Sequence, residues 1–363
     1  MKRFIRTLAA AAAASLPLLA STASAGAANA APAVRAAALQ AEFHYLALPD
    51  KRFVPVSVVR ATDGSLWIDA QARVKCGTDE ICILQAFGRW SGGKIAMTTF
   101  PGSNGRIGIT AFPLNGAYQS LSAGPNGTAW IVSGSDLFVF DTSGTLSATY
   151  ALAPPTGQLT APQLGADGRM WLTDFASDVY AVAADGTVST YACSGSCGAL
   201  IAGRDHDLWG IGLTSDYQQF LYSVSTGGTV TEYPGISGTL VAGPGSRLAT
   251  YGATEIESIG PQEQLAPLAD LQPLDWDQTL YVSASQSTLW VAGSRNNEAQ
   301  AEVATVSERG GIRSTPLRHV PCSESYVYFS PLVLGSDGAM YGGFGCGDIT
   351  GTHAGYLLRV TPE

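Results

Sequence analysis

A seven-residue pattern recurs along most of this 363-residue chain and constrains its fold more than any other feature. Most copies join a polar or glycine-rich turn to a large aromatic residue. The copies are ATDGSLW at 61–67, GPNGTAW at 124–130, GADGRMW at 165–171, GRDHDLW at 203–209, GPGSRLA at 243–249, ASQSTLW at 284–290 and GSDGAMY at 335–341. Seven copies with a period of about 40 residues, apart from two longer units, predict a seven-bladed β-propeller, in which each unit is a four-stranded sheet.

The residues within one unit support this interpretation. Short apolar runs alternate with Asp-Gly turns over residues 163–192, and such turns supply the positive φ that a tight hairpin needs. A second set of turns indicates a hairpin between the third and fourth strands, as in DTSGTL (141–146), AADGTV (183–188), STGGTV (225–230) and SERGGI (307–312). We therefore expect the repeated turn to be scaffold, with its Trp packed between adjacent blades.

The two ends of the chain predict how the ring closes. After the seventh copy the sequence offers one further strand, HAGYLLRVTP at 353–362, and the outer strand of that blade is missing. The segment EFHYLALP at 42–49 resembles the fourth strands of other units. We expect it to complete the last blade and remove a free sheet edge. The prediction is an all-β, single propeller over residues 42–363, preceded by an Ala-rich leader over 26–41.

The first 25 residues have the pattern of a secretory signal peptide. Basic residues at the start precede an apolar run and then ASA, which predicts cleavage after Ala25, with cleavage after Ala30 as the alternative. Neither site is followed by Cys, so no lipid anchor is expected. No later stretch supplies the ~18 uninterrupted apolar residues of a membrane span. We expect a periplasmic or secreted protein.

The charge of the chain excludes one class of partner. Removing the signal takes away three of the 20 basic residues and none of the 29 acidic ones, so the formal net charge falls from −9 to −12. Nucleic acid is therefore not an expected partner, because its phosphates demand a basic surface. We expect an acidic, soluble monomer.

Six cysteines in an exported chain suggest three disulfides, for which about fifteen connectivities are possible. A zinc site is disfavoured because no Cys-x-x-Cys pair is present. Two pairs are close in sequence and leave a third; the proposed disulfides are Cys76–Cys82, Cys193–Cys197 and Cys322–Cys346.

The repeats resemble the G-P-D-G-x-L-W-F-T-E motif of the virginiamycin B lyase (streptogramin lyase) family of seven-bladed propellers, over about residues 42–362. NHL-type and gluconolactonase-type propellers share this motif. The resemblance implies opening of a cyclic depsipeptide ester by elimination, with a histidine, a Glu-x-His pair and magnesium near the central axis. The Glu-x-His of this chain, Glu42 and His44, falls on the predicted closing strand at an outer edge. Of the motif's acidic ends, WLTD retains one at Asp174.

Candidate site residues follow from the expected ring. The Asp-Gly turns should lie on one face, and the blade connections and the loops between second and third strands on the other. That second face should carry all three disulfides, which either stiffen a binding surface or staple long loops. Its candidate catalytic residues are His353 and Asp174; its candidate Mg²⁺ or Ca²⁺ ligands are Asp174, Asp275 and Asp277; its candidate ligand contacts are Tyr217, Tyr251, Trp276, Arg295, Tyr326 and Tyr328.

Two functions remain open from the sequence. The first is a non-catalytic binding scaffold for a peptide, glycan, protein or small molecule, favoured because the motif's acidic end is mostly replaced. The alternative is a metal-dependent enzyme, either a lyase of the streptogramin type or a lactonase. The sequence motifs of the common serine hydrolases, zinc proteases and P-loop nucleotide-binding proteins are absent.

Overall fold

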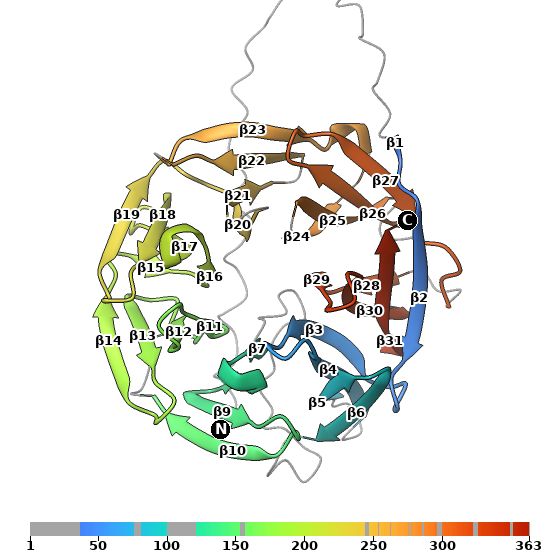
Figure 1. Cartoon of the computed structure of the whole chain (residues 1–363), viewed down its shortest axis with the longest axis horizontal. Coiled ribbons are helices and arrows are strands. Elements are labelled where there is room, and N and C mark those ends of the chain that lie inside the picture. The colour runs from blue at the N-terminus through green and yellow to red at the C-terminus, as the bar shows by residue number, and fades with distance from the viewer. Residues whose placement is uncertain are drawn as a thin grey trace, which may run out of the picture. The chain divides into compact units, whose positions relative to one another are not determined.

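Seven small antiparallel sheets stand in a ring, and the chain passes through them in order (Figure 1). The structure, a computed structural model, describes residues 37–75, 81–99, 121–152, 157–243, 247–252, 254–261, 263–274, 276, 278–284, 287–295, 300–321, 326–348 and 351–362. All of them belong to one unit, Arg35–Glu363. The predicted seven-bladed, all-β propeller is confirmed.

Each blade runs from an inner to an outer strand. Blade one consists of β3 Val54–Arg60, β4 Leu66–Lys75, β5 Ile81–Ser91 and β6 Lys94–Thr99. Blade two consists of β7 Leu121–Ala123, β8 Ala129–Ser133, β9 Asp136–Phe140 and β10 Leu146–Ala151. Blade three consists of β11 Gln163–Leu164, β12 Met170–Thr173, β13 Asp178–Val182 and β14 Val188–Ala192. Blade four consists of β15 Ser196–Cys197, β16 Ile201–Ala202, β17 Leu208–Leu213, β18 Gln219–Val224 and β19 Val230–Pro234. Blade five consists of β20 Thr239–Ala242, β21 Leu248–Tyr251, β22 Glu255–Ile259 and β23 Leu265–Asp270.

Blade six consists of β24 Gln278–Ala284, β25 Thr288–Arg295, β26 Gln300–Ser307 and β27 Ile312–Pro316. Blade seven consists of β28 Tyr326–Phe329, β29 Val333–Leu334, β30 Met340–Asp348 and β31 Gly351–Pro362. The N-terminal strands β1 Ala37–Ala38 and β2 Ala41–Ala47 are added to these two blades. Short 3-10 turns occur at Pro125–Gly127, Arg204–His206 and Gln272–Leu274.

Strand β2 closes the ring as predicted. It pairs antiparallel with β31, in a register that runs from Ala41 opposite Pro362 to Ala47 opposite Tyr356. Blade seven is therefore built from both ends of the chain, and Figure 1 shows β2 along its outer side. Glu42 and His44 lie on this outer strand, half or more exposed, with His44 Nε2 3.5 Å from Glu42 Oε2.

The segment 26–41 was expected to be an Ala-rich leader, but its residues Ala37–Ala38 form the short strand β1. Strand β1 pairs in parallel with β27, the outer strand of blade six. The backbone N–H of Leu39 donates to the Ser314 carbonyl at 2.8 Å, and the Leu39 side chain is 9% exposed. The edge of β27 offers unpaired backbone groups, and this short segment satisfies several of them. The predicted signal peptide lies outside the described residues.

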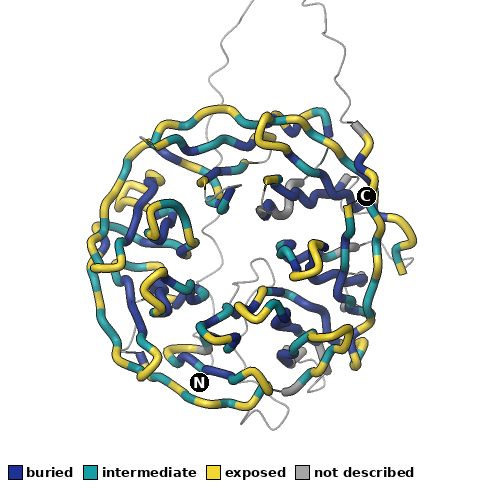
Figure 2. Tube along the Cα trace, in the orientation of Figure 1, coloured by how far each residue is buried: buried dark blue, intermediate teal, exposed yellow. Residues whose placement is uncertain are grey.

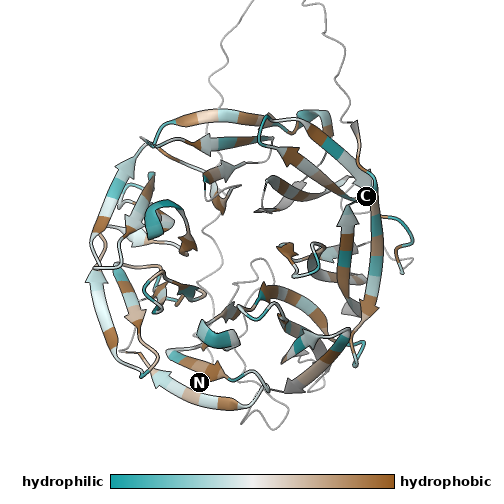
Figure 3. Ribbon diagram, viewed as in Figure 1, coloured by the Kyte–Doolittle hydropathy of each residue, from teal (hydrophilic) through white to brown (hydrophobic). Residues whose placement is uncertain are grey.

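The described residues form seven hydrophobic core clusters, one between each pair of adjacent blades. Trp171, for example, packs with Val179 of its own blade and with Leu208 and Tyr222 of blade four. The Trp residues of the repeat are at most 4% exposed: Trp67, Trp130, Trp171, Trp209 and Trp290. The repeated turn-and-Trp pattern is thus scaffold, as predicted. Figure 2 shows the buried residues gathered on the inner and middle strands, and Figure 3 shows hydrophobic and hydrophilic residues alternating along outer strands.

The ring has two unlike faces, which we call the turn face and the loop face. The turn face carries the hairpins that join strands one to two and three to four of each blade. The loop face carries the loops between strands two and three and the connections from one blade to the next. Antiparallel pairing within each blade forces this division, because successive strands end at opposite faces.

Arginine side chains join neighbouring blades on the turn face. The Arg169 guanidinium donates to Asp167 Oδ2 at 2.7 Å and lies 4.6 Å from the centre of the Trp171 ring. It also donates to the Thr226 carbonyl of blade four at 2.5 Å. Two further arginines combine contact with their blade's Trp with a hydrogen bond to the next blade, Arg89 and Arg204. The turn face is thereby tied together by charge and by stacking.

Candidate binding surface on the loop face

A disulfide shapes the connection between blades three and four on the loop face. Cys193 is bonded to Cys197, with their Cα atoms 6.4 Å apart. Both cysteines are buried, and Cys197 belongs to the short strand β15, which pairs with the end of β17. We call residues 193–198 the strap, because they cross from one blade to the next.

Backbone hydrogen bonds fasten the strap on both sides. The N–H groups of Cys193 and Cys197 donate to the carbonyls of Ser177 and Ala176 in blade three, at 2.8 and 2.9 Å. On the other side, Gly198 donates to the Ile211 carbonyl of blade four at 3.0 Å. The strap is therefore held to both blades independently of the disulfide.

Two buried hydroxyl groups fix the end of the strap from below. Thr173 Oγ1 and the Tyr222 hydroxyl both donate to the Gly198 carbonyl, at 3.1 and 2.5 Å. Tyr222 is fully buried, and desolvation raises the pKa of its hydroxyl, which keeps it protonated and able to donate. Outside, Ser194 donates through its N–H and its hydroxyl to the carboxylate of Glu232, at 3.1 and 2.6 Å.

Three large apolar side chains in the two blades that the strap joins face solvent. Phe175 is 37% exposed, Leu213 is 38% exposed and Tyr217 is 82% exposed. Within the described part of the chain, these are the large hydrophobic side chains that remain exposed. Phe175 and Tyr217 lie in the loops between the second and third strands of blades three and four, and Leu213 is the last residue of β17, the second strand of blade four. We call them the apolar patch.

Contacts through the strap connect the members of this patch. Ser196 pairs with Leu213, and its hydroxyl donates to the Phe175 carbonyl. A Cβ placed on Gly198 would lie 3.8 Å from Cε1 of Phe175, so that ring lies against the strap. Tyr217 closes the turn that follows Leu213, since its N–H donates to the Thr214 carbonyl at 3.0 Å.

The backbone holds both aromatic members in an uncommon conformation. Phe175 has φ of 52° and Tyr217 has φ of 60°, in the left-handed region that bulky residues rarely adopt. Such a conformation costs on the order of 1–3 kcal/mol and tends to occur at functional sites. Two exposed aromatic rings are thus presented at the expense of stability.

Asp174, a predicted catalytic and metal-binding residue, is buried beneath this patch. Its side chain is 0% exposed, and Oδ1 accepts from the N–H groups of Ala176 and Asp178, at 2.9 and 3.2 Å. Burial, followed by the charges of Asp174 and Asp178, raises the pKa of Tyr180 to about 12. Asp174 therefore shapes the loop that presents Phe175.

Several predicted ligand contacts instead pack within the ring. Trp276 lies on the bare backbone of Gly293, and its Nε1 donates to Glu302 Oε2 at 2.6 Å. Tyr251 is half-buried in the same cluster, and the Tyr328 hydroxyl donates to the Val56 carbonyl at 3.3 Å. Among the predicted ligand contacts whose side chains are described, Tyr217 is the one that projects freely into solvent.

The remaining predicted residues have side chains that the structure does not describe, or lie outside its residues altogether. The side chains of Arg295, Tyr326, His353 and Cys82 are not described, although their backbones lie in strands. Cys346 is disulfide-bonded. Its predicted partner Cys322 lies outside the described residues, as do Cys76, Asp275 and Asp277.

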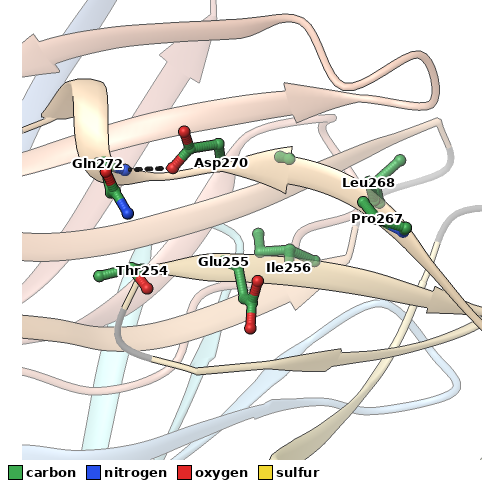
Figure 4. Close-up of a pocket in the computed structure, with 8 residues that line it drawn as sticks. Thr254, Glu255, Ile256, Pro267, Leu268, Asp270 and Gln272 are labelled. Carbon is green, nitrogen blue, oxygen red and sulfur yellow. Dashed lines mark hydrogen bonds between the residues drawn. The ribbon is translucent and has the colours of Figure 1, made fainter. Parts of the chain in front are cut away.

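The described residues include one of the three candidate metal ligands, Asp174. Among the described residues, no three His, Cys, Asp or Glu side chains come together as a metal site requires. A cavity of about 320 Å³ lies on blade five between β22 and β23 (Figure 4). Its two carboxylates, Glu255 and Asp270, point apart, and Asp270 Oδ1 accepts from the N–H of Gln272 at 2.9 Å.

The described segments contain no helix long and apolar enough to cross a membrane.

Tyr217 was predicted from the sequence as a ligand contact and is exposed on this surface, whereas Phe175, Leu213 and Glu232 were not predicted. Phe175 and Leu213 stand four residues after the Trp of the repeat, where the other copies have small or polar residues. That departure is the signal that could have identified them.

No protein-family model and no curated protein matches this sequence. Solved structures do match. A streptogramin B lyase is 14% identical with a TM-score of 0.62, over 89% of this chain and 98% of that one. Virginiamycin B lyase from Staphylococcus aureus is 13% identical with a TM-score of 0.63, over 89% of this chain and 100% of that one. YCF48 bound to D1 peptide is 15% identical with a TM-score of 0.60, over 90% of this chain and 98% of that one.

At these identities the likeness is one of fold. It confirms the architecture that the repeats predicted and leaves the activity to the chemistry of the site. The chain has the seven-bladed propeller fold of the streptogramin lyases.

Proposed function

We propose that this protein is an exported, non-catalytic binding scaffold that holds a peptide segment of a partner on the apolar patch. The observation that carries the proposal is the exposure of Phe175, Leu213 and Tyr217 in two blades that a rigid strap joins. Exposed apolar side chains grouped on one surface mark interaction sites in soluble proteins. The signal peptide predicted at residues 1–25 supports export.

The rigidity of the strap favours binding. A disulfide, three backbone hydrogen bonds and two buried hydroxyl groups hold residues 193–198 in place before any partner arrives. A preorganised surface loses less conformational entropy when it binds. A propeller of the same fold, YCF48, is known bound to a peptide, the D1 peptide.

The second candidate is a metal-dependent enzyme, a streptogramin-type lyase or a lactonase. The fold of the two lyases favours it. The buried and hydrogen-bonded state of Asp174 disfavours a catalytic role for this residue.

Selection of random twelve-residue peptides displayed on phage, with the mature oxidised protein as bait, tests the scaffold function. We expect peptides whose affinity falls about tenfold or more in Phe175→Gly/Tyr217→Gly, since aromatic residues dominate binding energy at interfaces. Glycine adopts positive φ freely, so this variant should fold well.

The matched control is His206→Gly, which replaces another residue with positive φ, 64°, on the turn face. It should leave peptide affinity unchanged. Equal affinities in all three proteins would refute the proposed site. In parallel, ring opening of virginiamycin B with added Mg²⁺, followed by mass spectrometry, would support the lyase if it occurs.

A further inference from the structure

We infer that the partner segment is cationic, with Lys or Arg next to its apolar residues; this rests on the binding role proposed above. The inference comes from the distribution of charge around the apolar patch. Between Arg169 and Arg295 the sequence contains thirteen acidic residues and two basic ones, Arg204 and Arg247.

The few basic residues of blades three to five all lie on the opposite side of the ring. Arg169, Arg204 and Arg247 each occur in the hairpin between first and second strands, on the turn face. Two of them are also held there, because Arg169 pairs with Asp167 and Arg204 with Glu263. These blades therefore contribute no Lys or Arg to the loop face.

Acidic side chains, by contrast, surround the patch. Asp216 is exposed in the same turn as Tyr217, one residue away. Asp178 closes the turn that presents Phe175, because the Asp174 N–H donates to its carbonyl at 3.3 Å. Glu232 is exposed beside the strap, where its carboxylate accepts from Ser194. Three acidic residues thus accompany the apolar side chains, in the turns of Phe175 and Tyr217 and beside the strap, and blades three to five supply no Lys or Arg to this face.

This arrangement discriminates between partners. An anionic segment would bring like charges beside Asp178, Asp216 and Glu232, which costs affinity and slows encounter. A neutral apolar segment could cover the patch but would gain no electrostatic attraction from the carboxylates beside it. A cationic segment with apolar residues fits both the apolar patch and the carboxylates. Its apolar side chains can cover the two aromatic rings and the leucine of the patch, while its ammonium or guanidinium groups reach the carboxylates.

Fluorescence anisotropy with three synthetic peptides tests the inference. The probes are labelled (Gly-Lys-Phe-Ser)₃, (Gly-Glu-Phe-Ser)₃ and (Gly-Lys-Ser-Ser)₃, each added to the mature oxidised protein. We expect the Lys-Phe peptide to bind about tenfold or more tightly than either other peptide. Its affinity should fall about tenfold between 50 mM and 500 mM NaCl, because salt screens exposed pairs.

Charge-neutralising variants localise the effect. Asp216→Asn/Glu232→Gln should weaken the Lys-Phe peptide about three- to tenfold, at a few tenths to 1 kcal/mol for each exposed pair. The matched control Asp205→Asn/Glu308→Gln removes the same charge from the turn face, where both residues are exposed. It should change the affinity less than twofold.

Each other result overturns the inference. The Glu-Phe peptide could bind as tightly as the Lys-Phe peptide, with Phe175→Gly/Tyr217→Gly abolishing the binding of both. That result would support the apolar patch as the binding site and refute its preference for cationic segments. If the two Lys peptides bind equally and the patch variant does not matter, the attraction is a diffuse effect of an acidic protein. If none of the three binds, the cationic preference is wrong, and the phage selection decides the binding role separately.

Discussion

The turn face and the loop face of this propeller are made by the same strands and have opposite character. On the turn face, charged groups are paired: Arg169 with Asp167, Arg204 with Glu263, and Arg359 with Asp337 at 3.0 Å. On the loop face, blades three and four expose aromatic rings in strained backbone conformations, beside carboxylates without basic neighbours from their own blades.

This difference shows which residues the packing between blades constrains and which residues it does not. Most blades must pack a Trp or Tyr of the repeat against the next blade, so turns and ion pairs recur around the turn face. The loops on the other face carry no such requirement, and their residues vary from blade to blade. A surface that is both irregular and exposed, yet braced by a disulfide, is where we place the partner.

Removing a blade-to-blade Trp should have the largest effect. Trp171→Ala should lower the free energy of unfolding by about 3–5 kcal/mol, because the ring is 1% exposed and stacks on Tyr191 with centroids 5.5 Å apart. Urea unfolding followed by circular dichroism measures it. Leu213→Ala on the loop face is the comparison and should cost less than about 0.5 kcal/mol. Equal losses would contradict the division between the faces.

Opening the strap should have the next largest effect. Cys193→Ala/Cys197→Ala should lower the free energy of unfolding by about 2 kcal/mol, as expected for a short disulfide loop. Peptide affinity at the patch should fall as well, because the strap is then held by hydrogen bonds alone. Calorimetry and anisotropy on the same samples measure both quantities. Unchanged affinity would mean that the disulfide stabilises the fold without organising the surface.

Acid should weaken the turn face. Burial alone would raise the pKa of Asp167, but hydrogen bonds from Arg169 and Trp171 and the charge of Arg169 outweigh it, so this pKa lies below its usual value. The pKa values of Asp63 and Asp337 are also lowered, by Ser65 with Arg89 and by Tyr341 with Arg359, against burial.

A lowered folded pKa stabilises the protein above the unfolded value of about 3.9, and this stabilisation is lost as the pH falls through the folded value. The three pairs should together contribute about 1.5 kcal/mol after screening by solvent. Denaturant unfolding at pH 7 and pH 3 should show a smaller difference in Asp63→Asn/Asp167→Asn/Asp337→Asn than in the wild type. An unchanged difference would remove these pairs as the cause.

Restoring a glycine to the turn should have the smallest effect. His206 stands where other copies of the repeat have Gly, such as Gly168, and has φ of 64°. His206→Gly should raise the free energy of unfolding by about 0.5 kcal/mol, because relief of the left-handed backbone slightly exceeds the entropy that glycine adds to the unfolded chain. A small rise in melting temperature would show it, whereas a fall would mean that the imidazole makes a stabilising contact.

Most of the fold could be predicted from the sequence, because each blade repeats the same local chemistry. The turn glycines, the buried Trp and the missing outer strand together predicted seven sheets and their closure by β2. Strand β1 could not be predicted, since two alanines carry no period and their pairing depends on the free edge of β27.

The site could be predicted far less well. Loop residues are not constrained by the repeat, so position within a loop does not tell whether a side chain faces solvent. Asp174 and Trp276 were expected on a ligand surface, yet the first bonds to the backbone of its own loop and the second to Glu302. Phe175 was missed because its exposure follows from a left-handed backbone that nothing in the sequence encodes plainly.

Photo-crosslinking tests the central claim, that the partner is held on the loop face of blades three and four, most directly. Two proteins are compared, Tyr217→p-benzoylphenylalanine and His206→p-benzoylphenylalanine, each mixed with the tightest peptide from the phage selection and irradiated. We expect crosslinked product at position 217 and none at position 206. Crosslinking at position 206 in place of 217 would contradict it, by placing the partner on the turn face.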